Sequence, residues 1–127
     1  MSNDLPTFAA PHGPETVQVD LGPVAGFADK TPRVVQSSRG PILVYRESPA
    51  VIHVYLAICP HMGNHLREQD CANGTLVCNL HNWEFDLRSG RSLNPGFTAG
   101  LLRLEYEVRE GRLIVEVPPE APDPMGR

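Results

Sequence analysis

Two short pairs of residues in the middle of the chain could bind a metal. Cys59 and His61 are separated by one residue, Cys78 and His81 are separated by two, and sixteen residues lie between the pairs. Thiolate and imidazole are good ligands for zinc and iron. Because the members of each pair are so close in sequence, each pair has to share one tight loop. The spacing therefore predicts a metal site that is formed by two loops.

The spacing alone leaves three other interpretations open. The four residues could simply be part of a buried core, although two cysteines and two histidines rarely fall into such paired spacing by chance. They could bind structural zinc, for which two cysteines and two histidines are a suitable set, although a gap of one residue is unusual in a zinc knuckle. Either cysteine could also be a nucleophile with a histidine base, but no third orienting group stands out.

The segments around these pairs read as short strands separated by turns. Apolar residues alternate with polar ones over four to eight positions, and no helical period runs through any long segment. We expect an all-β protein, with a short helical turn within 64–73 and a tight turn at Asn73-Gly74. The expected strands are 16–20, 33–36, 42–46, 51–58, 75–78, 83–87, 101–108 and 112–117, with hairpins joining the third to the fourth and the last two.

Composition excludes several classes of protein. The 127 residues suggest one domain. A net charge of −4 without a basic stripe argues against nucleic-acid binding, and no apolar run is long enough for a membrane helix. Seven of the thirteen prolines lie in the first fourteen and last ten residues, so we expect a flexible N-terminal arm (1–15) and a flexible C-terminal tail (119–127). An odd number of cysteines and no secretory signal predict a cytoplasmic protein.

The two pairs and their flanking residues resemble the Rieske [2Fe–2S] family. The matching segments are Cys59-Pro60-His61-x-Gly63 and Cys78-x-x-His81-x-Trp83-x-Phe85-Asp86-Leu87-x-x-Gly90, with a weaker likeness at Asn94-Pro95-Gly96. The resemblance covers about residues 40–118. It implies one [2Fe–2S] cluster per chain, with the two cysteines on one iron and the two histidines on the other.

The resemblance also implies the Rieske fold. In that fold, antiparallel β-sheets form a base into which a small cluster-binding subdomain is inserted. We expect the Rieske domain to span residues 16–118, with the cluster-binding subdomain at about 57–97.

Departures from the family pattern narrow the class. Rieske subunits of cytochrome complexes carry a disulfide between the two loops, but the matching positions here are Asn64 and Leu80. Those subunits also place Ser and Tyr hydroxyls against sulfur, where this chain has Trp83 and Phe85. Fewer donors to sulfur predict a reduction potential near the low end of the Rieske range, roughly −150 to −50 mV. This is the branch that serves oxygenases.

The function implied by the resemblance is electron transfer. We expect a soluble ferredoxin without catalytic activity of its own, which takes electrons from a reductase and passes them to a terminal oxygenase through transient docking. The chain is too short to include the mononuclear iron domain of an oxygenase. Two alternatives stay open: a Rieske subunit bound tightly within a larger oxidoreductase, and a zinc-holding or redox-sensing interaction module. No nucleic acid or membrane is expected as a partner.

Other residues with metal-binding side chains are predicted to be structural. His53 falls on an expected strand and is interpreted as a packed or edge histidine. His65 is interpreted as a surface histidine of the first loop, and Cys71 as a free or partly buried thiol. Trp83 and Phe85 are expected to pack in the core beneath the metal site.

Overall fold

The computed structural model describes residues 16–60, 63–78, 82–96 and 99–118. Within these ranges the chain forms nine β-strands and two short 3-10 helices, η1 (Val24–Gly26) and η2 (Glu68–Asp70). The predicted all-β class is therefore confirmed. In this part of the chain, no helix has the length and apolar character needed to cross a membrane.

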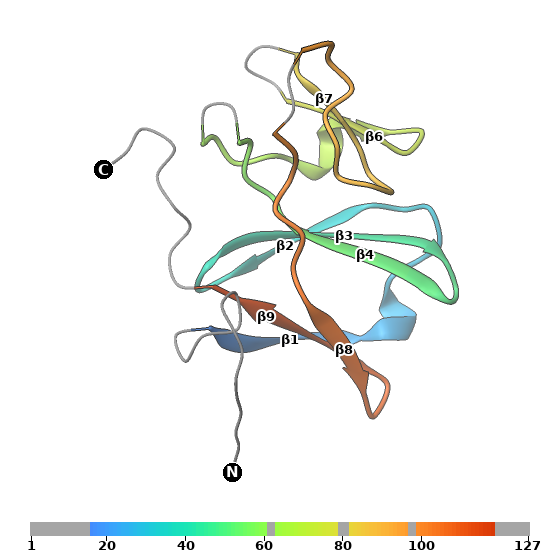
Figure 1. The fold of residues 1–127 in the computed structure, drawn as a ribbon. Coiled ribbons are helices and arrows are strands. Elements are labelled where there is room, and N and C mark those ends of the chain that lie inside the picture. Colours follow the sequence, from blue (N-terminus) through green and yellow to red (C-terminus); the bar gives the residue numbers. More distant parts are fainter. Residues whose placement is uncertain (1–15, 61–62, 79–81, 97–98, 119–127) are drawn as a thin grey trace.

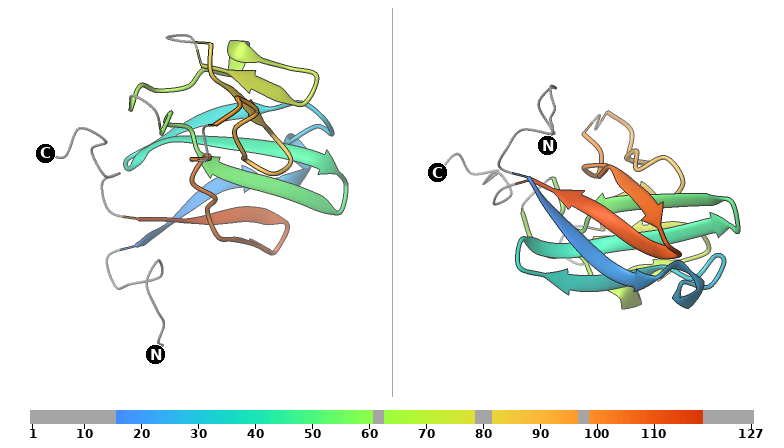
Figure 2. Two further views of the ribbon diagram at one scale, coloured as in Figure 1. Left: turned by 45° about the horizontal axis from the view of Figure 1, so that its top comes forward. Right: turned by 90° about the horizontal axis from the view of Figure 1, so that it is seen from below.

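The strands form three antiparallel sheets that are stacked on one another (Figure 1). The central sheet contains β2 (Arg33–Ser37), β3 (Gly40–Ser48) and β4 (Val51–Leu56). The base sheet contains β1 (Val17–Pro23), β9 (Arg112–Val117) and β8 (Tyr106–Arg109). The small sheet contains β5 (Cys71–Ala72), β6 (Thr75–Val77) and β7 (Glu84–Asp86). Figure 2 shows from two further sides that the central sheet lies between the other two.

The central sheet is buried on both faces, and its sequence shows why. Successive side chains of a strand point to opposite faces, and residues 42–45 of β3 are all apolar or aromatic and buried. Ile42 and Val44 belong to a core shared with the base sheet, whereas Leu43 and Tyr45 belong to a core shared with the small sheet. We call these the base core and the upper core.

The strand predicted at 101–108 is wrong over its first half. Residues 101–104 lie outside the β8–β9 ladder and run beside β4, where Leu56 N–H donates to Leu102 O and Leu104 N–H donates to Val54 O. The reason is burial, since Leu101 packs in the upper core and Leu104 in the base core. The segment thus connects the two cores before β8 begins at Tyr106.

Four smaller features can be compared with the prediction. Strand β1 continues to Pro23 through a register shift after Asp20, whereas the sequence predicted a strand that ends at residue 20. Strand β5 was not predicted, because two residues are too few to show an alternating pattern. The helical turn expected within 64–73 is confirmed as η2. Asn73 and Gly74 have φ angles of 54° and 79°, so the predicted tight turn is confirmed as well.

Tyr55 joins the central sheet to the segment that follows the small sheet. Its buried hydroxyl donates to Leu87 O at 2.9 Å and accepts from Arg103 Nη2 at 3.1 Å. The Arg103 guanidinium also lies over the Tyr55 ring, 5.0 Å from its centroid. Burial raises the pKa of Tyr55 to about 12, so the hydroxyl keeps its proton and remains a donor at neutral pH.

We predict that Tyr55→Phe lowers the free energy of unfolding by about 1–3 kcal/mol, because it leaves buried polar groups without a partner. The measurement is chemical denaturation followed by circular dichroism. Tyr106→Phe is the control, since Tyr106 is exposed on β8 and exposed substitutions usually change stability by less than about 0.5 kcal/mol. Equal stability of the two variants would show that the Tyr55 hydroxyl does not hold these segments together.

Candidate metal centre

Cys59 lies at the end of an alternating pattern that begins in β4. Tyr55, Ala57 and Cys59 are all fully buried in the upper core. Beyond β4 the chain turns back on itself, so that Cys59 N–H donates to Asn64 O at 2.9 Å and Leu66 N–H donates to Ala57 O at 2.9 Å. The same period that packs Tyr55 therefore places Cys59 inside the protein, at the mouth of a hairpin loop.

Cys78 reaches its position in the same way from β6. Leu76 and Cys78 are two residues apart, and both are fully buried in the upper core. Leu76 is opposite Phe85 in the β6–β7 ladder, and the pairing continues to Cys78, whose N–H donates to Trp83 O at 2.7 Å. Cys78 is thus the last inward residue before the second loop.

The two hairpins share one hydrogen-bond pattern. In the first, Gly63 N–H donates to Cys59 O at 2.8 Å, and in the second, Asn82 N–H donates to Cys78 O at 3.0 Å. In each case the donor is four residues after the cysteine and has a left-handed backbone, with φ of 80° at Gly63 and 58° at Asn82. Glycine and asparagine are the residues that adopt this conformation most readily. We call the two segments, 57–66 and 75–86, the loop hairpins.

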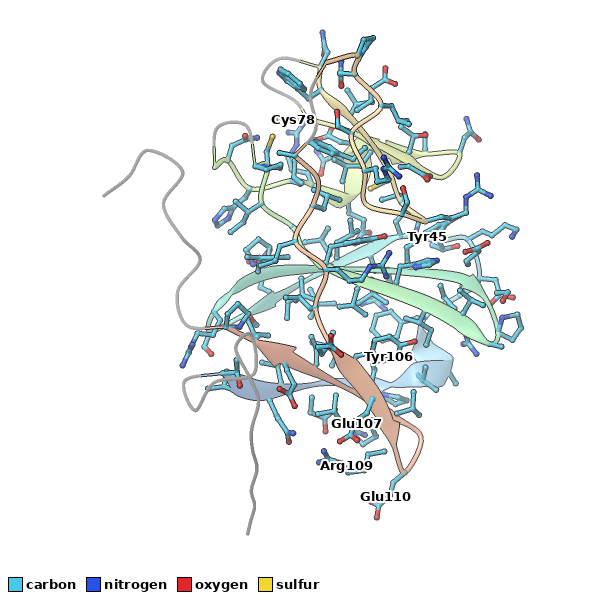
Figure 3. The ribbon with its side chains drawn as sticks, in the orientation of Figure 1. Tyr45, Cys78, Tyr106, Glu107, Arg109 and Glu110 are labelled. Carbon is cyan, nitrogen blue, oxygen red and sulfur yellow. The ribbon has the colours of Figure 1, made fainter. Side chains whose placement is uncertain are left out.

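Asn64 connects the loop hairpins. Its backbone carbonyl accepts the Cys59 N–H, as described above, and its side-chain amide lies against Cys78, with Nδ2 3.3 Å and Oδ1 3.5 Å from Sγ. One residue therefore touches both cysteines, which places the two predicted sulfur ligands on neighbouring loops. Figure 3 shows Cys78 at the end of the molecule opposite the β8–β9 turn, where Glu110 is labelled.

The two cysteine thiols that the structure describes at this site suit a metal centre with sulfur ligands. Both Cys59 and Cys78 are fully buried, and no disulfide joins any of the three cysteines, all of which lie within the described residues. His61 and His81 fall outside the described residues. By sequence, His61 is two residues after Cys59 and His81 is three residues after Cys78. The residues that the structure does describe hold no group of three or more His, Cys, Asp or Glu side chains suited to a metal.

The surroundings of His53, His65 and Cys71 agree with the prediction that they are not ligands. His65 is exposed, and half-buried His53 lies between Glu47 Oε1 at 2.8 Å and Arg103 Nη1 at 3.3 Å. Burial, followed by the neighbouring acidic side chains, raises the pKa of Cys71 to about 12. This thiol therefore stays protonated at neutral pH and is a poor metal ligand.

The aromatic residues after the second loop also behave as predicted. Phe85 is fully buried in the upper core, and Trp83 packs against that core while remaining partly exposed.

The model of the Rieske [2Fe–2S] domain family matches residues 17–101, which is about two thirds of the chain and includes both loop hairpins. The chain belongs to this family. Membership implies a Rieske-type [2Fe–2S] cluster, in agreement with two buried thiols on paired loops. The predicted family, fold and cofactor are thereby confirmed.

Two curated relatives are similar over part of their length. The ferredoxin component of the alkene monooxygenase system of Xanthobacter autotrophicus is 32% identical over 68 residues, which are 53% of this chain and 55% of that protein. The oxygenase component of 3-ketosteroid-9-alpha-monooxygenase from Mycolicibacterium smegmatis is 31% identical over 65 residues, which are 51% of this chain and 17% of that protein. The chain thus aligns with about half of the first relative and less than a fifth of the second.

The fold is also similar to that of solved structures. The ferredoxin of carbazole 1,9a-dioxygenase from Nocardioides aromaticivorans IC177 superimposes with a TM-score of 0.62 at 16% identity, over 81% of this chain and 98% of that chain. At this level of identity the likeness shows the fold alone.

Sequence reasoning missed the role of Asn64. It identified this position only as one where a disulfide cysteine is absent, whereas the structure gives the side chain a contact with the second predicted sulfur ligand. A polar residue at a position that directly follows the loop glycine was the available signal, but its partner lies fourteen residues away. Local pattern does not reveal such a contact.

We predict that position 82 needs a residue that tolerates a left-handed backbone. Asn82→Gly keeps the loop, whereas Asn82→Val costs about 1–2 kcal/mol and shortens the half-life of the bound cluster. The measurement is the decay of visible absorbance at a fixed raised temperature. The control is Asn73→Val, which introduces the same strain at φ 54° in the β5–β6 turn. If both valine variants lose the cluster at the same rate, the effect is one of general stability.

Proposed function

We propose that this chain is a one-electron carrier that takes electrons from a reductase and passes them to a terminal oxygenase. The pair of matched loop hairpins is the observation that carries this proposal, because it brings two buried cysteines together on neighbouring loops, with Asn64 in contact with both. The names of the relatives support it, since one is the ferredoxin component of a monooxygenase system. A further similar structure is described as a complex of reduced oxygenase and oxidized ferredoxin.

We infer that Cys59, Cys78, His61 and His81 are the four ligands of the cluster. The cluster supplies the chemistry of accepting and releasing one electron. Two ferric ions, two sulfides, two thiolates and two neutral imidazoles have a net charge of zero, so one electron changes the charge of the site only from zero to −1. We assign the Rieske domain to residues 16–118 and its cluster-binding subdomain to about 57–97.

The described residues give the site a buried side and an exposed side. The two cysteines are fully buried in the upper core, which keeps water from the sulfur ligands. On the other hand, His65 in the first loop hairpin is exposed. Leu93 is also 52% exposed, although its backbone N–H donates to the carbonyl oxygen of Glu84 in the second loop hairpin. An exposed leucine bonded to the second loop hairpin suits a docking surface for a redox partner, because redox interfaces are small and a few residues carry most of the binding energy.

The ligand assignment predicts specific spectra. The purified protein should contain two irons and two sulfides per chain and, after reduction, give a Rieske-type EPR signal. His81→Cys should abolish that signal or shift its mean g value toward that of a cluster with four cysteine ligands. Cys71→Ser is the matched control and should leave the spectrum unchanged, because Cys71 is not a ligand. A colourless protein that contains zinc, or an unchanged spectrum for His81→Cys, would contradict the assignment.

The docking surface predicts a kinetic effect without a change in potential. Leu93→Asn should lower the rate of electron transfer to a partner oxygenase by about tenfold, as expected when an apolar anchor worth about 1.4 kcal/mol is lost. The measurement is stopped-flow oxidation of the reduced protein by that oxygenase. Val108→Asn is the control, because Val108 is similarly exposed at 48% but lies on β8 in the base sheet. Equal rates for the two variants would place the docking surface elsewhere.

The likeness to an oxygenase component favours a second candidate, a Rieske subunit bound tightly within a larger oxidoreductase. Affinity purification of the tagged chain from its native cell, followed by gel filtration, separates the two. A carrier elutes alone at the mass of the chain, whereas a subunit elutes with stoichiometric partners that survive high salt.

A further inference from the structure

The side-chain amide of Asn64 is placed to form a hydrogen bond with the sulfur of Cys78. Its amide nitrogen lies 3.3 Å from Cys78 Sγ and its amide oxygen 3.5 Å from the same atom. A protonated thiol can donate to the oxygen, but a thiolate has no proton and can only accept. When Cys78 binds metal as a thiolate, the contact that remains favourable is therefore the donation from Nδ2.

The surroundings hold Asn64 in this position. Its carbonyl accepts the Cys59 N–H at 2.9 Å, and the next two residues continue the pairing of the first loop hairpin through the His65–Ile58 bridge and the Leu66 N–H to Ala57 O bond. The backbone of Asn64 is thus fixed to the hairpin of one cysteine, while its side chain reaches the sulfur of the other. The residue is half-buried, so water competes only partly for the amide.

We propose that the Asn64 side-chain amide is a hydrogen-bond donor to the Cys78 ligand sulfur, which raises the reduction potential of the cluster and connects the two loop hairpins without a disulfide. This rests on the proposed function, because it requires a cluster bound through Cys78. A donor to a ligand sulfur stabilises the more negative, reduced state of the site, so its removal has to shift the potential in the negative direction. Asn64 acts through the sulfur of Cys78 and is therefore a positioning residue.

The test is the midpoint potential of purified Asn64→Ala and Asn64→Asp, measured by redox titration followed by EPR. Both variants lose the donor. The aspartate keeps the shape of the side chain and adds a negative charge, so its shift should be the larger of the two. Asn73→Gly is the control, since it removes an asparagine amide from the β5–β6 turn, at a position where the left-handed backbone accepts glycine. Its potential should equal that of the wild type.

Resonance Raman spectra give a second readout that a merely structural role would not move. A thiolate that loses a hydrogen bond binds iron more strongly, so the Fe–Sγ stretching bands should shift to higher frequency in Asn64→Ala. An unchanged potential together with unchanged Fe–Sγ bands, in variants that retain the cluster, would overturn the proposal.

The loss of the cluster from a variant and the absence of a Rieske EPR signal from the wild-type protein are both informative. If Asn64→Ala folds but loses the cluster, Asn64→Gln, which returns an amide to this position, must recover part of the bound iron, and no recovery would overturn the proposal. If the wild-type protein has no Rieske EPR signal, the proposed function fails before any variant is compared. A normal wild-type signal with an unshifted variant refutes only the role of Asn64.

Discussion

The structure depends on one constraint, which is that the central sheet has an apolar core on each face. Because side chains alternate along a strand, each buried apolar residue of β3 and β4 is committed to the base core or the upper core by its position. Tyr55, Ala57 and Cys59 share the upper core, so the cysteine is placed by the same alternation that packs the tyrosine. A shift of one residue along β4 would turn Cys59 out of the upper core, which means that the packing of the base core and the position of this cysteine are not independent.

Much of this could be predicted from sequence because the signals were local. The alternating runs predicted β3, β4 and β9 closely, and the paired Cys and His residues predicted two loops. The features that sequence reasoning missed depend on contacts between distant segments. Residues 101–104 alternate like a strand, yet they lie beside β4 because Leu101 and Leu104 are required in different cores. The contact of Asn64 with Cys78 likewise arises only when two hairpins meet.

The sequence predicted few hydrogen-bond donors to the cysteine sulfurs, but the contact between Asn64 and Cys78 adds one. From sequence, Trp83 and Phe85 replace two hydroxyl donors, and the structure agrees that both aromatic residues pack against the upper core. Asn64 nevertheless provides an amide at 3.3 Å from one sulfur. An absent disulfide therefore does not leave the loops unconnected.

The return of the chain from the small sheet explains how the two loop hairpins keep a fixed separation. A Cβ atom at Gly90 would lie 2.7 Å from Tyr55 Cε1, and one at Gly100 would lie 2.6 Å from Gly90 O. The backbone therefore crosses directly against the Tyr55 ring, and Leu101 N–H donates to Gly90 O at 2.8 Å. Tyr55 is anchored there by Leu87 and Arg103. Because close-packed interiors deform little, this crossing fixes the second hairpin relative to β4 and hence Cys78 relative to Cys59. Two glycines and one buried tyrosine therefore set the position of one cysteine relative to the other.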